Sequence, residues 1–330
     1  MKILIGMNYK YWALGYKRGA ESLRHECDIY EYVKNAEIFG KLTYLPFLYQ
    51  VGARKSNILL KRKIIEFKPD LFLVSKGELI FPSTLNFIRK KLGIKSILWF
   101  PDDPQLFERI SRYIAKYYDF VFTSSFKSVE NYEKIGVDKV EYIPFCCDPT
   151  FHRNIELTKD DKRKFTADIT FVGKFYPERE KVLKALLDYD LKIYGQNWQF
   201  SDKDVRSKWT GQAVFGEDLI KVYNASKIVL NIHDNEMKYG GMKSNIRSFE
   251  AMGCGAFVLS DKPDGIEDIF DIDKQIVCFK SKKQLLYFVD YYLENEKERE
   301  KIARRGQKRT YKDHTFYNRM KKVISVAENL

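Results

Sequence analysis

The feature that most constrains the fold is an alternation of short apolar runs with helical patterns, which occurs twice along the chain. Continuous apolar strands separated by amphipathic helices are typical of a parallel sheet that is covered on both faces. The strands predicted in the first half are Lys2–Gly6, Asp70–Ser75, Lys95–Phe100, Asp119–Ser124 and Val140–Phe145. The helices predicted between them are Gly15–His25, Asn57–Phe67, Ser83–Leu92, Gln105–Tyr117 and Phe126–Ile135.

A polar segment at residues 151–167 interrupts this alternation, and we predict it to be a linker, although Lys159–Lys164 also fits a turn of surface helix. The pattern then restarts. The strands predicted after the linker are Asp168–Gly173, Leu191–Gly195, Lys227–Ile232, Ala256–Asp261 and Gln275–Phe279. The helices are Glu178–Leu187, Glu217–Ala225, Ser244–Met252, Lys282–Glu294 and Lys297–Gln307.

The chain is therefore predicted to be an α/β protein with two Rossmann-like, doubly wound domains, residues 1–150 and 168–312. The two domains should face a cleft, because ligands of such domains bind at the carboxyl ends of the strands. A last amphipathic helix, within residues 313–330, is predicted to cross back onto the first domain.

The net charge and the cysteine content indicate which kind of partner the protein binds and in which cellular compartment it lies. The 58 Lys and Arg residues exceed the 45 acidic residues, which gives a net charge of +13 and favours anionic partners. The five cysteines lack the spacing of a zinc site, which favours unpaired thiols in a reducing compartment. The start of the chain does not read as a signal peptide, and no apolar run is long enough for a membrane span. We therefore expect a cytoplasmic protein.

A candidate phosphate site precedes the predicted helix Ser244–Met252. Gly240 and Gly241 allow the backbone to approach a ligand, and the free N–H groups of a helix start bind phosphate. Lys243 and Arg247 add positive charge there. Glu250 follows Arg247 by three residues, so both can share one helix face. The alternative is an ordinary turn and a helix with an incidental ion pair.

The second half resembles the CgeB-like (spore-protein type) glycosyltransferases of the GT-B group. The resemblance lies in six segments in the family's order between Asp168 and Met320: DITFVGKFYPERE, LKIYGQNW, YNASKIVLNIH, IRSFEAMGCGAFVLSD, GIEDIF and RRGQKRTYKDHTFYNRM. The first half resembles the family's N-terminal domain mainly through ILWFPDDP. The resemblance implies a GT-B fold with an acceptor-binding N-terminal domain and a C-terminal domain for a nucleotide-diphosphate sugar, with a UDP sugar as the expected donor.

Carried onto this chain, the resemblance assigns the donor contacts. Glu250 matches the glutamate that binds the ribose hydroxyls, Lys174 and Arg179 match the basic pair near the diphosphate, and Arg247 matches an arginine on the Glu250 helix. One position departs from the pattern of related retaining enzymes: their first glutamate falls at Met242 here. The sugar and the stereochemistry of transfer are therefore left open.

Other candidates for donor contacts follow strands of the second half. Trp198 and the backbone around Phe215 could line a pocket for the nucleobase, although tryptophan is more often part of a core. His233 follows a strand and could touch phosphate or sugar, and the alternative is a structural histidine.

The acidic pair Asp102 and Asp103 provides the candidates for a general base toward the acceptor hydroxyl, because it follows a strand at the cleft end of the first domain. The alternatives are a helix N-cap and a Mg²⁺ or Mn²⁺ site. The cationic residues of the second half can stabilise a departing diphosphate by themselves. We therefore expect a metal-independent enzyme with no cofactor besides the donor.

Basic residues concentrate in the first domain, with 11 basic and three acidic residues between Val51 and Phe100. This surplus is either a solvated surface or a docking surface for an anionic acceptor, which could be a polymer, a lipid-linked glycan, a protein or DNA, with possible peripheral membrane contact. The function predicted is transfer of a sugar from a nucleotide-diphosphate sugar to an acceptor hydroxyl. The alternatives are a non-catalytic sugar-nucleotide-binding protein of envelope or spore assembly, and a glycosyltransferase that acts on modified DNA.

Overall fold

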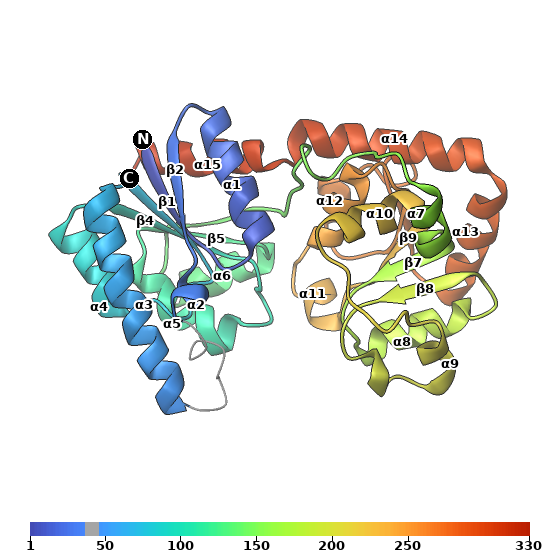
Figure 1. The fold of residues 1–330 in the computed structure, drawn as a ribbon, viewed down its shortest axis with the longest axis horizontal. Helices are drawn as coiled ribbons and strands as arrows, with labels where there is room; N and C mark the ends of the chain where they lie inside the picture. Colours follow the sequence, from blue (N-terminus) through green and yellow to red (C-terminus); the bar gives the residue numbers. More distant parts are fainter. Residues whose placement is uncertain (37–45) are drawn as a thin grey trace. The chain divides into compact units, whose positions relative to one another are not determined.

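The computed structural model describes residues 1–36 and 46–330, which form two compact units. Unit 1 comprises Met1–Pro144 and Phe316–Leu330, and unit 2 comprises Phe145–Thr315. Each unit is built on one parallel sheet with helices packed against it (Figure 1). The predicted α/β class, with two doubly wound sheets, is confirmed.

The sheet of unit 1 has six strands in the order β2-β1-β3-β4-β5-β6, all parallel. Its strands are β1 Lys2–Gly6, β2 Glu26–Tyr30, β3 Leu71–Ser75, β4 Lys95–Phe100, β5 Phe120–Thr123 and β6 Val140–Tyr142. Strand β2 was not predicted, because its sequence ECDIY lacks a continuous apolar run. An edge strand tolerates such polar residues because it pairs on one side only.

The helices of unit 1 connect these strands, and several differ from the predicted ranges. They are α1 Lys10–Ser22, α2 Tyr32–Asn35, α3 Pro46–Phe67, α4 Pro82–Asn86, α5 Arg112–Ile114, α6 Phe126–Lys134 and α15 Phe316–Glu328, with short π or 3₁₀ turns η2 Phe87–Lys91, η3 Phe107–Ser111 and η4 Ala115–Tyr117. α3 begins 11 residues before the predicted start at Asn57. The residues just before Asn57 show no single apolar face, because apolar Val51 is exposed whereas Ala53 is buried.

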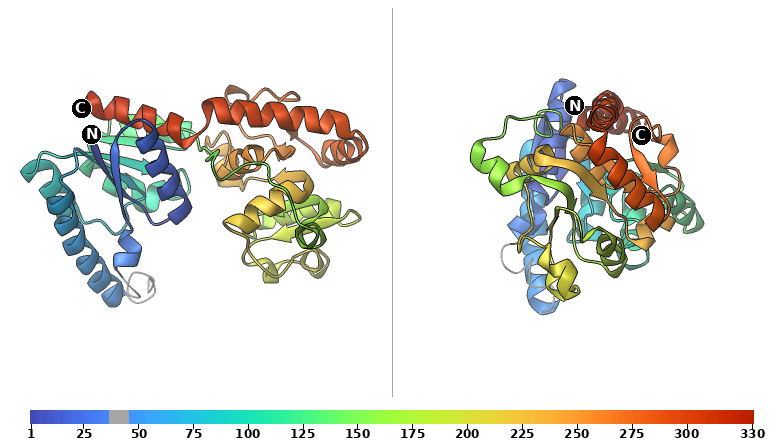
Figure 2. Two further views of the ribbon diagram at one scale, coloured as in Figure 1. Left: turned by 45° about the horizontal axis from the view of Figure 1, so that its top comes forward. Right: turned by 90° about the vertical axis from the view of Figure 1, so that its right-hand side faces the viewer.

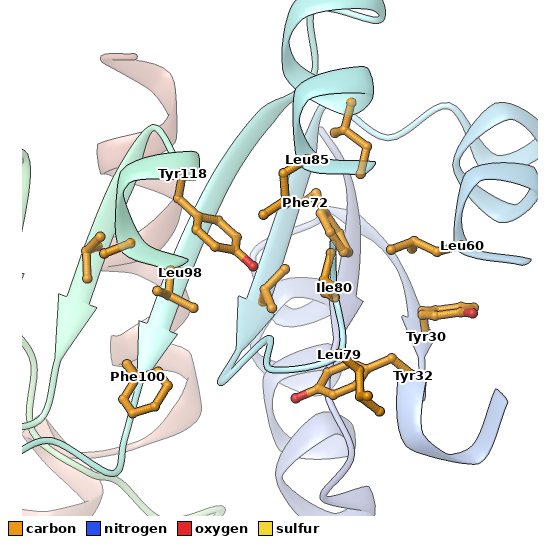
Figure 3. Packing of buried hydrophobic residues seen from close by; sticks show 14 of the residues in the cluster. Tyr30, Tyr32, Leu60, Phe72, Leu79, Ile80, Leu85, Leu98, Phe100 and Tyr118 are labelled. Carbon is orange, nitrogen blue, oxygen red and sulfur yellow. The ribbon is translucent and has the colours of Figure 1, made fainter. Parts of the chain in front are cut away.

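Side chains of the unit 1 strands alternate between two packed layers, as the pleat of a strand requires. Leu4, Phe72 and Leu98 belong to the core cluster that α3 and α4 cover with Leu60 and Leu85 (Figure 3). Trp99, the residue after Leu98, lies on the opposite face, where its ring centroid is 5.4 Å from that of Tyr16 on α1.

The C-terminal helix α15 packs on α1 within unit 1, as predicted (Figures 1 and 2). Two glycines of α1 make the close approach possible: a Cβ atom on Gly19 would lie 2.7 Å from the carbonyl oxygen of Phe316, and one on Gly15 would lie 2.4 Å from its ring. The Tyr16 and Phe316 rings also meet edge to face, with centroids 4.8 Å apart. These glycines therefore serve helix packing.

The sheet of unit 2 has five parallel strands in the order β11-β10-β9-β7-β8. Its strands are β7 Ala167–Val172, β8 Leu191–Tyr194, β9 Ser226–Asn231, β10 Val258–Asp261 and β11 Val277–Phe279. Its helices are α7 Lys159–Phe165, α8 Pro177–Leu183, α9 Lys203–Ser207, α10 Glu217–Ala225, α11 Asn235–Tyr239, α12 Ile246–Gly253, α13 Lys282–Glu294 and α14 Glu296–Asp313, with 3₁₀ turns η5 Lys184–Leu186, η6 Trp198–Phe200 and η7 Ile266–Asp268. The predicted linker contains α7, which begins with a capping box between Thr158 and Asp161.

Candidate functional site

The strand order of unit 2 places a crevice at the carboxyl ends of β7 and β9. The chain leaves β7 for the edge strand β8, whereas from β9 it proceeds in the opposite direction to β10 and β11. Ligands of open parallel sheets bind at such a switch point. The segments that meet there are the residues after β7, the residues after β9 and the start of α12.

Two buried arginines, Arg179 of α8 and Arg247 of α12, connect the ends of β7 and β9. Arg247 donates from Nε to the carbonyl oxygen of Val172, the last residue of β7, and from Nη1 to Oδ1 of Asn231, the last residue of β9. Arg179 donates from Nε to the carbonyl oxygen of Ile232 at 3.1 Å and from Nη1 to that of Lys174 at 2.8 Å. Both arginines are therefore held by fixed carbonyl groups at the switch point.

These arginines form no salt bridge with a carboxylate in the described part of the chain, although the charges of Asp234 and Asp261 act on Arg179 from nearby. Neither Arg179 nor Arg247 forms an ion pair with an acidic residue within residues 1–36 and 46–330, and Nη2 of each donates to no described protein atom. Burial, and then the charge of neighbouring Arg179, lower the pKa of Arg247 to about 10. Burial also lowers the pKa of Arg179. Two adjacent cations with free donors form a site that favours an anion.

Glycines shape the approach to this pair. A Cβ atom on Gly173 would lie 2.5 Å from Nη2 of Arg247, so only glycine leaves this nitrogen its space. Gly195 has φ +150°, and a Cβ atom there would lie 1.9 Å from the carbonyl oxygen of Gly173. The loop after β7 can therefore lie close to the end of β8.

The start of α12 adds buried polar atoms that lack a partner among the described residues. Ser244 is 2% exposed and Asn245 is 7% exposed, and neither Oγ of Ser244 nor Nδ2 of Asn245 has a hydrogen-bond partner. Oδ2 of buried Asp234, which caps α11, has none either. Buried polar groups are almost always hydrogen-bonded, so an orphaned hydroxyl and amide beside two unpaired arginines indicate a ligand site.

Ser244, Asn245 and Asp234 were not predicted as site residues, and the helical pattern alone gave no sign of them. The pattern predicts a helix that starts at Ser244, whereas Asn245 is the N-cap and its Oδ1 accepts from the backbone N–H of Arg247. Asn and Asp before an apolar helical pattern are the signal that would have found both caps. Gly240 ends α11, and Gly241 has φ +91°, a conformation that favours glycine.

His233 and Asp261 form hydrogen bonds that hold the start of α12 in place. Nδ1 of His233 lies 2.7 Å from Oδ1 of Asp261, and the backbone N–H of Asn245 donates to Nε2 of His233 at 3.3 Å. Both ring nitrogens are thus engaged with the protein in the buried histidine. This geometry fits the structural alternative for His233.

The remaining predicted cations differ in accessibility. Lys174 is exposed after β7, with Nζ 5.9 Å from the ring centroid of Tyr176. Lys243, two residues before the N-cap, forms an ion pair with Asp268 of the segment after β10. Lys174 is thus the more available of the two for a phosphate.

Glu250 lies one turn beyond Arg247 on α12, with its side chain 13% exposed. Its Oε1 is 3.7 Å from Nε2 of His152, which comes from the segment predicted to be a linker. His152 also accepts at Nδ1 from the backbone N–H of Asp148 at 3.0 Å. Glu250 is therefore at the edge of the buried region, and no sequence signal pointed to its histidine neighbour.

Trp198 and Phe215, the predicted base contacts, lie in different environments. Trp198 is fully buried, and its Nε1 donates to the carbonyl oxygen of Gly173 at 2.8 Å. The buried indole therefore packs beneath the loop after β7 and holds that loop through the hydrogen bond to Gly173. Phe215 is exposed just before α10, where Gly216 has φ +60°.

In unit 1 the switch point lies between β1 and β3. The two acidic residues after β4, Asp102 and Asp103, differ in burial and in their partners. Asp103 is fully buried and accepts hydrogen bonds of 2.8 Å from Ser111 Oγ, Thr123 Oγ1 and Tyr132 OH. Burial raises the pKa of Asp103 to about 6, although these three hydrogen bonds oppose the rise. Asp102 has a side chain that is 29% exposed and forms an ion pair with Lys76, the residue after β3.

Lys76 and Tyr9 were not predicted. Nζ of Lys76 donates to the hydroxyl of Tyr9 at 3.0 Å and lies 5.0 Å from its ring centroid. Burial lowers the pKa of Lys76, but the charge of Asp102 and the two hydrogen bonds outweigh burial and raise it overall. A lysine directly after a buried strand, followed by Gly77, was the available sequence signal.

Neither a membrane-spanning helix nor a metal-binding cluster is found among the described residues. No helix within residues 1–36 and 46–330 combines the length and apolarity that a bilayer crossing requires. The same residues contain no group of three or more His, Cys, Asp and Glu side chains placed to hold a metal ion.

Comparison with known proteins shows which families and proteins this chain resembles. Residues 179–325 match the model of a glycosyl transferase-like family. The spore protein CgeB of Bacillus subtilis (strain 168) is 25% identical to the chain over 273 residues, which cover 77% of this chain and 81% of CgeB.

Solved structures share the fold over the whole chain. Anabaena HepE in complex with UDP and glucose has a TM-score of 0.64 at 12% identity and covers 100% of both chains. Sucrose-phosphate synthase from Thermosynechococcus elongatus has a TM-score of 0.69 at 12% identity, with 99% of this chain and 98% of the synthase covered. An α-glucosyltransferase in complex with UDP and a 13-mer DNA has a TM-score of 0.62 at 10% identity, with 99% of each chain covered.

The residues matched by the glycosyl transferase-like family model include Arg179, Arg247 and Glu250. The likeness to CgeB extends over most of the chain. Two doubly wound units, with a C-terminal helix packed on the first, are the GT-B architecture. The chain is a glycosyltransferase with the GT-B fold, and it is similar to the spore protein CgeB.

Proposed function

We propose that unit 2 binds the diphosphate of a UDP sugar at the switch point between β7 and β9, without a metal ion. The observation that carries this proposal is the pair of buried guanidinium groups, Arg179 and Arg247, which have no carboxylate partner in the described part of the chain and whose Nη2 atoms are free to donate. Orphaned Ser244 Oγ and Asn245 Nδ2 supply neutral donors beside them. Charge-assisted hydrogen bonds of this kind are the strong ones in proteins.

These groups would act most strongly as the donor breaks. Cleavage of the bond between the sugar C1 and the phosphate oxygen transfers negative charge to the leaving UDP. Fixed cations and a helix start stabilise that charge without reorganisation, and one such preorganised donor contributes about 3 kcal/mol to lowering the barrier. Exposed Lys174 supplies a further cation, and Glu250 accepts from the ribose hydroxyls.

We assign acceptor binding to unit 1 and the role of general base to Asp102. Asp102 is the exposed member of the pair, whereas three hydroxyl groups already occupy the carboxylate of Asp103. The ion pair with Lys76 fixes the position of the Asp102 carboxylate after β4. The acceptor hydroxyl would bond to the sugar C1 while its proton passes to Asp102. Asp103 would fix the loop that presents Asp102.

The base, the sugar and the compartment are further parts of the proposal. We place the nucleobase near Phe215, whose ring is exposed at the start of α10, and expect the buried Trp198 to shape this region from the core side. All five cysteines are buried and free, which supports the proposal of a reducing, cytoplasmic compartment.

A binding and turnover experiment tests the donor assignment. We expect UDP and UDP sugars to raise the melting temperature of the full chain more than GDP, ADP or TDP sugars, and uridine to have little effect because it lacks the diphosphate. Release of labelled sugar, to water or to an acceptor, should follow for one UDP sugar. If no sugar nucleotide changes the melting temperature or turns over, the donor assignment is wrong.

The relative CgeB is a spore protein, which favours one alternative, a non-catalytic sugar-nucleotide-binding protein of spore or envelope assembly. That alternative predicts a melting-temperature shift with UDP sugars, no turnover with any acceptor, and identical behaviour of Asp102→Asn and the wild type. Turnover that depends on Asp102 would exclude it.

A further inference from the structure

A line of exposed aliphatic side chains runs along the outer face of α3. Val51, Ile58 and Ile65 are 38%, 56% and 53% exposed and follow one another at intervals of seven residues. Seven residues are nearly two helical turns, so the three side chains point in one direction. The opposite face of α3, with Leu60 and Ile64, lies in the core of unit 1. The aliphatic line is therefore not needed for packing within unit 1.

Basic side chains border this line on both sides. Arg54 and Lys61 are on one side of the helix face, and Lys55 and Arg62 are on the other, as the 100° step per residue places them. Arg54 and Arg62 form no ion pair with an acidic residue among residues 1–36 and 46–330. Glu66 is the one acidic residue in the sequence of α3. The outer face of α3 thus combines an apolar centre with a positive border.

The positive surface continues onto η2. Nζ of Lys61 lies 5.3 Å from the ring centroid of Phe87, the first residue of η2, so the two elements are adjacent. Lys90 and Lys91 are exposed at the end of η2, and Leu92 after them is 39% exposed. We define the α3 surface as the outer face of α3 from Val51 to Ile65 together with this end of η2.

We infer that the α3 surface docks unit 1 on an anionic lipid membrane. An interfacial helix places its apolar side chains among the acyl chains and its Lys and Arg side chains among anionic headgroups, and α3 carries both features on one face. The inference goes beyond the proposed sugar transfer, because the α3 surface shares no residue with the proposed donor or acceptor site.

The positive charge of the α3 surface would also suit duplex DNA. The line of exposed aliphatic side chains favours an anionic membrane over DNA as the partner. DNA phosphates accept hydrogen bonds from cations, and non-specific binding to them gains essentially all its affinity from charge. Three exposed β-branched side chains in the centre of the positive border would face the polar backbone of DNA without a partner. A bilayer, by contrast, buries them.

Vesicle co-sedimentation of the full chain tests the inference. We expect binding to vesicles of phosphatidylcholine with added phosphatidylglycerol, and little binding to phosphatidylcholine alone. The double variant Ile58→Asn/Ile65→Asn keeps every charge and should bind at least roughly tenfold more weakly, because two aliphatic side chains no longer enter the bilayer. Arg54→Gln/Arg62→Gln should lose about fivefold per removed charge and weaken the salt dependence.

Matched controls come from unit 2. Phe200→Asn/Tyr287→Asn removes two exposed aromatic side chains, and Lys301→Gln/Arg305→Gln removes two exposed charges of α14. Both control variants should bind vesicles as the wild type does. Circular dichroism and the UDP-induced melting shift should be unchanged in all variants, so a failure of docking is separate from a failure of the donor site.

Two outcomes would overturn the inference. The first is no preference of the wild type for anionic vesicles at low salt. The second is equal vesicle binding by Ile58→Asn/Ile65→Asn and the wild type, together with loss of duplex DNA binding in Arg54→Gln/Arg62→Gln, which would make the α3 surface a nucleic-acid surface.

Discussion

Units 1 and 2 share a sheet topology but differ in the charge at the corresponding edge. In both sheets the first strand lies between the second and the third, so the switch point occupies the same position. In unit 2 this edge carries Arg179 and Arg247 without a carboxylate partner in the described residues, whereas in unit 1 the cation Lys76 is neutralised by Asp102. The strand order therefore determines where on each sheet a ligand can bind. The side chains at that edge determine which ligand suits the site: an anion in unit 2, or a hydroxyl group that donates its proton in unit 1.

The largest effect should come from removing the proposed base of unit 1. Asp102→Asn should lower kcat for sugar transfer by roughly 100- to 10,000-fold, because the amide cannot take the acceptor proton. Its affinity for UDP should stay at the wild-type value, since Asp102 is not part of unit 2. Steady-state transfer kinetics and calorimetric UDP binding measure the two quantities. The control is Asp138→Asn, which changes an exposed carboxylate of unit 1. If Asp102→Asn keeps the wild-type kcat, Asp102 is not the general base, and the proposed difference in role between the sheet edges of units 1 and 2 is wrong.

The next effect concerns the anion site of unit 2. Arg247→Lys should weaken UDP binding by roughly 10- to 100-fold, because an ammonium group cannot keep the bonds to both strand ends and also donate to a phosphate. Uridine, which has no diphosphate, should bind equally to both proteins. The control Arg299→Lys changes another buried arginine of unit 2, on α14. Equal weakening of UDP and uridine binding would indicate a folding defect.

A smaller effect tests the ribose contact. Glu250→Gln should lower UDP affinity by about tenfold, because an amide oxygen is a weaker acceptor than a carboxylate. The loss should be smaller with 2′-deoxy-UDP, in which one of the two hydroxyls is missing. Glu236→Gln, at an exposed position of unit 2, is the control. If the variant and the wild type discriminate equally between UDP and 2′-deoxy-UDP, Glu250 does not contact the ribose.

The last prediction concerns stability and leaves UDP affinity unchanged. The folded protein holds a proton on Asp103 up to about pH 6, whereas in the unfolded chain the carboxyl has its ordinary value of 3.8. The free energy of unfolding should therefore fall as pH rises from about 4 to about 6, by roughly 3 kcal/mol relative to Asp103→Asn. Denaturant unfolding of both proteins at several pH values measures this difference. A difference that does not change with pH would place the pKa of Asp103 near its ordinary value.

Much of the fold could be predicted because it depends on local patterns. Strands β1, β3, β4, β5, β7, β9 and β10 are apolar runs whose positions follow from the sequence alone. The weakly patterned β2 and the first half of α3 were missed because an edge strand carries mixed residues and the residues just before Asn57 show no single apolar face. The start of α12 shifted from Ser244 to Ile246 because Asn245 caps the helix.

The sequence by itself determined two doubly wound sheets, a basic chain, and Arg179, Arg247 and Glu250 as residues of one region. Only the tertiary structure decided which charges are compensated. It paired Lys76 with Asp102 and enclosed Asp103 among three hydroxyl groups. It left Arg179 and Arg247 without a salt bridge to any carboxylate of the described residues. The physical reason is that strand pairing and periodicity act within short segments, whereas burial and electrostatic compensation depend on which distant side chains meet.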